Sequence, residues 1–236
     1  MKLLDTSVFY FGLPSVRALK ALTVLAAAAA IALCSPMIAR AQGGNFGSDC
    51  VPPSGSEYAA SFHQLYAAGL INLADPIHDR FTNCDPPPGP FPGVHTVHSF
   101  GSRIRMKVSS DGGNSFQPME APAQVTVGML NSGPDGSGGT LFDTEMLQLD
   151  ISGGTLPPGT LIRESPTLAS TGQTHIKPIG GLYHIDSFFD IFTELSVDGG
   201  QTLMPSEGSP GHMEMRVPLP TGVQKSTWGT LKLMYR

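Results

Sequence analysis

The chain has 236 residues, of which 40% are hydrophobic and 14% are charged, and its formal net charge at pH 7 is −5. This apolar content excludes intrinsic disorder, and an acidic balance without basic clusters argues against nucleic acid as a partner. Glycine (28 residues) and proline (21 residues) make up about a fifth of the chain, which is typical of many short strands joined by tight turns.

Residues 1–41 have the features of an export signal. Lys2, Arg17 and Lys20 precede an apolar run from Ala21 to Leu33, and Ala39-Arg40-Ala41 matches a signal-peptidase site. As a helix this run would reach about 20 Å, less than the roughly 30 Å of a bilayer core. We therefore expect cleavage, no transmembrane segment afterwards, and a bacterial protein located in the periplasm or outside the cell. The mature chain would keep 10 basic and 18 acidic residues, a net charge of −8.

Residues 42–92 are expected to form an irregular N-terminal arm. Cys50 and Cys84 are the two cysteines left after cleavage, and such a pair in an exported protein predicts a disulfide. From Tyr58 to Tyr66 the apolar spacing is that of a helix, although a strand fits nearly as well. The stiff segment 86–90 (PPPGP) cannot join a sheet ladder and marks the end of the arm.

Residues 93–236 are expected to form the body of the protein, an all-β antiparallel β-sandwich. Two similar units, residues 93–129 and 181–217, lie 87 to 88 positions apart, and each alternates apolar and polar residues on both sides of a turn. We interpret them as an internal duplication of one hairpin unit. Two separate domains, residues 50–129 and 141–236, are the alternative.

The matched strands of the two units carry opposite charges on their outer faces. Arg103 corresponds to Asp190, and Lys107 corresponds to Glu194. If the two strands were antiparallel neighbours, these charges would face each other and favour one register. Two independently solvated faces explain the pattern equally well.

Each unit turns at a Ser-x-Asp-Gly-Gly motif, first at 109–116 (SSDGGNSF) and again at 196–203 (SVDGGQTL). The carboxylates of Asp111 and Asp198 can accept hydrogen bonds from N–H groups of their own turns. The glycines that follow allow positive φ without a Cβ clash; they are Gly112, Gly113, Gly199 and Gly200. The motif resembles the Asp-box, the hairpin motif of sialidase-like propellers. This resemblance implies a peripheral, structural role and no catalytic one.

A second resemblance covers most of the stretch from Phe142 to Ser206. The segments 162–167 (IRESPT) and 181–190 (GLYHIDSFFD), followed by the Asp198 turn, look like a family of exported bacterial proteins of unknown function. The resemblance implies an exported all-β protein and carries no activity.

The most promising binding surface is one strand face of the second unit. Its outward residues include two aromatic rings and two carboxylates, which can contact sugar rings and hydroxyl groups; they are Phe188, Asp190, Phe192 and Glu194. A solvated or covered sheet face is the competing interpretation. Carboxylates four residues apart on a strand are about 13 Å apart, too far for a glycosidase pair.

No other constellation predicts a reactive or metal-binding centre. The seven histidines are scattered, and His95 and His98 should lie on opposite faces of a strand. No cofactor is expected, apart from the weaker hypothesis that calcium binds at the acidic turns. Nucleophile-elbow and phosphate-loop motifs do not occur.

The sequence therefore favours an exported, non-enzymatic protein that acts in structure, surface association or binding. Carbohydrate or another exported protein is the expected partner. The competing hypothesis is a glycan-binding or glycan-active module that uses the face of Phe188, Asp190, Phe192 and Glu194.

Overall fold

The computed structural model describes residues 50–61 and 63–216, which belong to the compact unit Ala41–Arg236. This part of the chain consists of β-strands and connecting turns and contains no helix. The strands are β1 (Glu57–Ala59), β2 (His63–Tyr66), β3 (Ile71–Thr82), β4 (His95–Ser109), β5 (Gln117–Pro134), β6 (Thr140–Ser152), β7 (Leu161–Glu164), β8 (Ser170–Ile179), β9 (Leu182–Ile191), β10 (Thr193–Ser196), β11 (Met204–Pro205) and β12 (Gly211–Arg216).

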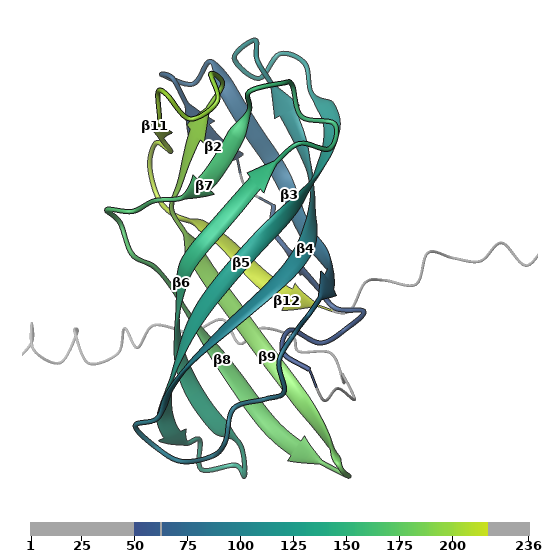
Figure 1. The fold of residues 1–236 in the computed structure, drawn as a ribbon, viewed down its shortest axis with the longest axis vertical. Coiled ribbons are helices and arrows are strands. Elements are labelled where there is room, and N and C mark those ends of the chain that lie inside the picture. The colour runs from purple at the N-terminus through teal and green to yellow at the C-terminus, as the bar shows by residue number, and fades with distance from the viewer. Residues whose placement is uncertain (1–49, 62, 217–236) are drawn as a thin grey trace, which may run out of the picture. The chain divides into compact units, whose positions relative to one another are not determined.

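Eight of these strands close into an antiparallel barrel (Figure 1). Hydrogen-bonded neighbours follow the order β6-β5-β4-β3-β1-β12-β9-β8, and β8 then pairs with β6 again. The last junction runs from Thr140↔Ile176 to Met146↔Ser170. Because β1 also pairs with β12, for example through Tyr58↔Met215, each of the eight strands has a neighbour on both sides.

The remaining strands continue the wall toward one end of the barrel. Asp150 and Ile151 of β6 pair with β5 on one side and with β7 on the other. Since β8 pairs with β6 farther along on that same side, β7 and β8 are two parts of one interrupted strand. In the same way β10 continues β9, and β11 precedes β12, while β2 continues β1 along β3. The result is an up-and-down meander in which strands that follow each other in sequence are neighbours in space.

The predicted β-sandwich is therefore wrong, although the all-β class is confirmed. A sandwich has two sheets with free edges, whereas here the pairing returns to its starting strand. Strands with one buried and one solvent-exposed face occur in both architectures. The alternation of apolar and polar residues shows that one face is covered, but it does not show which part of the protein covers it. Closure depends on the β1–β12 pairing, which joins the two ends of the described chain, for example Glu57 to Arg216.

The expectation of an irregular arm before residue 93 is also wrong. β3 is a full member of the wall and pairs with β4 from Asn72↔Ser109 to Thr82↔Gly101. The segment from Tyr58 to Tyr66 forms β1 and β2 instead of a helix. Helical spacing was misleading because strand alternation breaks between these two short strands.

Side chains from alternate positions fill the interior. In β5 every second residue from Ala121 to Asn131 is buried, and the same alternation runs through β9. The largest fully buried side chains are those of Tyr66, Phe142, Met129, Ile162, Ile185, Leu195 and Met215. With eight strands a barrel is just wide enough for side chains to fill its centre or to leave room for one small ligand.

The outer wall is held by ion pairs that differ from the predicted ones. Arg103 does not face Asp190. It donates two hydrogen bonds to Asp79, each 2.8 Å long, and a third to Glu120 at 3.2 Å. Lys107 pairs with Asp75 at 2.9 Å, because β3 and not β9 is the neighbour of β4.

The predicted disulfide joins Cys50 to Cys84, with Cα atoms 5.6 Å apart. Beside it, Val51 forms an isolated bridge to Asp85. The bond therefore ties the start of the described chain to the end of β3. Among the described residues, no helix is long and apolar enough to cross a membrane.

Candidate functional site

The two Asp-Gly-Gly turns are built in the same way. The hydroxyl of Ser109 donates to Asp111 Oδ1 at 2.6 Å, and that of Ser196 donates to Asp198 Oδ1 at 2.7 Å. In each turn the second glycine N–H donates to the serine hydroxyl at 2.9 Å. The N–H groups of Ser115 and Thr202 donate to the aspartate at 3.0 and 2.9 Å.

Strand pairing beside the turns is equivalent as well. Lys107 pairs with Pro118 in the first hairpin, and Glu194, 87 positions later, pairs with Pro205 in the second. Both turns lie at the barrel end that also carries residues 67–70 and 153–160, since Gly112 N–H donates to Leu70 O and Gly199 N–H donates to Gly159 O. This geometry is that of structural turns which fasten one end of the barrel. Origin by duplication, and membership of an Asp-box family, stay predictions.

Hydrogen bonding keeps both turn carboxylates ionised. The hydroxyls of Ser109 and Ser115 lower the pKa of Asp111 far below its ordinary value, and the Thr202 N–H and the Ser196 hydroxyl do the same for the pKa of Asp198. Both oxygens of Asp111 already accept hydrogen bonds, which leaves fewer lone pairs for a cation. Calcium binding at these turns stays a prediction.

The predicted binding face is divided between two strands. Phe188 and Asp190 lie on β9, Glu194 lies on β10, and Phe192 lies between them; all four are partly exposed. At Phe192 the backbone leaves the β9 ladder, donating its N–H to Ser170 Oγ at 3.0 Å and accepting from Ser165 N–H at 2.9 Å.

Phe188 and Asp190 belong to a cluster around His212 of β12. The rings of Phe188 and His212 have centroids 5.3 Å apart, and His212 Nδ1 lies 2.7 Å from Asp190 Oδ1. Partial burial would lower the pKa of His212, but the hydrogen bonds to Asp190 and Glu214 raise it above its ordinary value.

Glu194 is not part of this cluster. Its Oε2 accepts two hydrogen bonds from Arg163 of β7, at 2.7 and 3.1 Å, and its side chain is 13% exposed. The structure thus brings together Phe188, Asp190 and His212, and leaves Glu194 engaged with a neighbouring strand. His212 was not among the predicted site residues, because only the β9–β12 pairing places it opposite Asp190.

A pocket of about 310 Å³ is formed by residues of β3, β4 and β5 and of the turn at 153–156. It lies where β3 bulges, since Asp79 pairs with Arg103 but the next regular pair is Thr82 with Gly101. We name it the Arg80 pocket, and it is lined by Arg80, Thr82, Ser102, Arg103, Glu120, Ala121, Pro122 and Gly154. Gly154 belongs to the 153–156 turn, which is fixed against β5 by the hydrogen bond from Thr155 N–H to Glu120 O at 2.8 Å.

The charges around this pocket are unevenly paired. Arg103 is neutralised by Asp79 and Glu120. Partial burial would raise the pKa of Asp79, but hydrogen bonds from Arg103 and Arg105 lower it below its ordinary value, so it remains an anion. By contrast, no ion pair or side-chain hydrogen bond joins Arg80 to another described residue. Arg80 also has a φ of 55°, a strained conformation for a residue other than glycine that occurs more often at functional sites.

Sequence reasoning missed the Arg80 pocket because its residues come from the supposed arm and from the first hairpin. Two bulges interrupt the alternation of β3, and Asp75 in the first and Arg80 in the second both have positive φ. Such a break in alternation is the local signal of a bulge. It does not indicate which strands the bulge will face.

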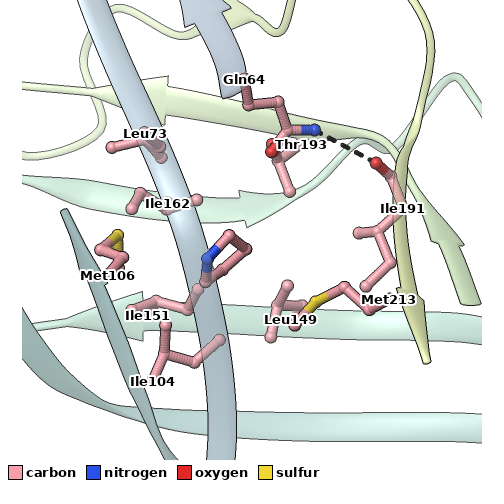
Figure 2. Close-up of a pocket in the computed structure, with 11 residues that line it drawn as sticks. Gln64, Leu73, Ile104, Met106, Leu149, Ile151, Ile162, Ile191, Thr193 and Met213 are labelled. Atoms are coloured by element: carbon pink, nitrogen blue, oxygen red, sulfur yellow. Dashed lines mark hydrogen bonds between the residues drawn. The ribbon is translucent and has the colours of Figure 1, made fainter. Parts of the chain in front are cut away.

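A second, smaller cavity of about 50 Å³ lies inside the barrel (Figure 2). Aliphatic side chains from β3, β4, β6, β7, β9 and β12 point into it, and Gln64 and Thr193 form one wall. The Gln64 amide donates to Ile191 O at 3.2 Å. Behind this wall Tyr66 hydrogen bonds to Thr193, and burial raises its pKa well above the ordinary value, so the phenol stays protonated.

The histidines do not form a metal centre in the described part of the chain. His95 is exposed and His98 is buried, in agreement with opposite strand faces. His175 lies 2.6 Å from Asp135, and His78 is enclosed in the barrel, where it hydrogen bonds to Ser102. Comparison of the chain with protein-family models, with curated proteins and with solved structures found no match.

Proposed function

We propose that this protein is an exported, non-enzymatic binding protein whose Arg80 pocket takes a carboxylated carbohydrate, such as a uronic acid residue. The observation that carries the proposal is an unpaired guanidinium beside hydroxyl groups and a carboxylate in a pocket of about 310 Å³. This volume is at the lower end of the range for small-molecule sites, roughly 300–1,000 Å³, and suits one or two sugar units.

The charge of the pocket favours a ligand that carries a carboxylate. Arg80 offers donors in a planar fork that matches a carboxylate. Asp79 is paired with Arg103 and Arg105, and Glu120 is paired with Arg103, so Arg80 is the lining cation that stays available to a ligand.

The remaining lining residues suit the rest of a sugar. Glu120 can accept hydrogen bonds from sugar hydroxyl groups, and the hydroxyl of Thr82 can donate or accept. Pro122 gives the pocket an apolar side against which the C–H face of a ring can pack. The combination of one cation, several neutral polar groups and an apolar patch supports an acidic saccharide better than a purely apolar ligand.

Calorimetric titration of the mature protein with glucuronate- and galacturonate-containing oligosaccharides tests this proposal, with the neutral glucose and galactose oligosaccharides as reference ligands. We expect measurable binding of the acidic ligands and a loss of about 10-fold or more in Arg80→Gln, because a charged hydrogen bond is worth roughly 1.5–3 kcal/mol. Lys177→Gln is the matched control, since it removes a positive charge from β8, away from the pocket. Equal binding of acidic and neutral sugars, or unchanged affinity in Arg80→Gln, would refute the proposal.

The face of Phe188, Asp190, Phe192 and Glu194 is a second candidate for glycan binding or glycan chemistry. It is supported by the contact of Phe188 with His212 and by the carboxylates of Asp190 and Glu214 beside them. The double variant Phe188→Ala/Asp190→Ala separates the two sites. Binding that is lost in this variant and retained in Arg80→Gln would move the function to this face.

A further inference from the structure

The described residues that line the interior cavity offer too few free polar groups to hold water. Most of its lining side chains present only hydrocarbon and sulfur to the space (Figure 2); they include Leu73, Ile104, Met106, Leu149, Ile151 and Ile191. A buried water molecule needs two to four polar partners, and cavities without them stay empty.

The polar groups of the cavity wall are mostly occupied by each other, and the second N–H of the Gln64 amide is the one side-chain donor of this wall without an acceptor among the described residues. Thr193 Oγ1 donates to Gln64 Oε1 at 3.1 Å and shares a second hydrogen bond with Tyr66 Oη. Gln64 in turn donates to Ile191 O at 3.2 Å. A water molecule in the cavity would therefore find a single free donor, fewer than the two to four partners that it needs.

We propose that this cavity is a binding site for a compact apolar molecule, independent of the Arg80 pocket. An apolar cavity of about 150 Å³ binds benzene or xenon in another protein. The present cavity, at about 50 Å³, is smaller, so the native barrel accepts xenon-sized guests and excludes benzene. Two of the side chains around it are methionines, Met106 and Met213, whose flexibility lets the space adapt to a guest.

Xenon is the probe of choice, applied under pressure to the mature protein while methyl resonances are followed by NMR. We expect saturable shifts for the methyl groups of Ile104, Ile151 and Ile191. Val127 is an internal control, because it lines a different cavity of only about 20 Å³, and its methyl groups should not shift. Absence of saturable shifts at the three isoleucines, or larger shifts at Val127, would overturn the proposal.

A second measurement uses an enlarged cavity. In Leu149→Ala the removed side chain adds space, so benzene should raise the melting temperature of this variant and leave that of the native protein unchanged. If Leu149→Ala does not fold, Ile151→Val makes a smaller enlargement and should increase xenon affinity. Failure of xenon affinity to respond to Ile151→Val, or an ordered water molecule inside the native cavity in a crystal structure, would contradict a dry apolar site.

Discussion

His78 should make the stability of the barrel depend on pH in a way that one substitution can isolate. Its side chain is only 4% exposed, hydrogen bonds to Ser102, and lies among the rings of Tyr58, Phe81 and Phe100. Burial lowers the pKa of His78 to about 4, against a smaller opposing effect of Asp79. In the unfolded chain the pKa of the same imidazole is about 6.5.

The sign and size of the effect follow from proton linkage. Below pH ~6.5 the unfolded chain binds a proton that the folded protein does not, so the free energy of unfolding falls as the pH falls. The contribution of His78 is complete above that pH and is lost progressively down to pH ~4. A slope of about 1.4 kcal/mol per pH unit over this window amounts to roughly 3 kcal/mol in total.

The assay is urea denaturation of the native protein and of His78→Gln between about pH 7.5 and pH 4.5. Glutamine keeps a polar group near Ser102 but does not titrate, so other acidic effects cancel in the difference between the two proteins. We expect the native protein to lose roughly 2–3 kcal/mol more than the variant over this range. A difference that stays constant, or an imidazole of His78 that titrates near pH ~6.5 in the folded protein by NMR, would refute the argument.

Two further predictions concern the turns and the closing strands. Asp111→Asn and Asp198→Asn should each lower the melting temperature at neutral pH, because a neutral amide replaces the charged acceptor of the turn. Since the pKa of each carboxyl is lowered in the folded protein, this deficit should be present above pH ~4 and should shrink as the acid form is approached; an equal deficit at all pH values would contradict the proposed role of charge. Gly172→Ala should cost about 1–3 kcal/mol or more in the free energy of unfolding, because the new Cβ would lie 2.0 Å from Phe188 O. Gly89→Ala, whose Cβ would meet its nearest neighbour at an ordinary 3.5 Å, is the control in the same denaturation experiment, and equal stability of the two variants would show that β8 and β9 can move apart at little cost.

The candidate site shows where prediction from sequence ended. Outward positions of Phe188 and Asp190 followed from alternation, and the structure places both on the outer side of β9. Their contact with His212 depends on β12 lying beside β9, a pairing across more than 20 residues of intervening chain. Arg80 was not predicted at all, because the bulge in β3 both breaks the local pattern and opens the pocket.

The sequence by itself determined the strands of the two hairpins, the pair of equivalent turns and the disulfide between Cys50 and Cys84. These features depend on residues that are close in the chain or, for the cysteines, on the expected removal of residues 1–41, which would leave Cys50 and Cys84 as a pair. Only the tertiary structure decided that the wall closes into a barrel through the pairing of β1 with β12. The physical reason is that side-chain alternation shows which face of a strand is buried but not which distant strand it hydrogen bonds to. A closed barrel and a sandwich therefore have the same alternating sequence pattern.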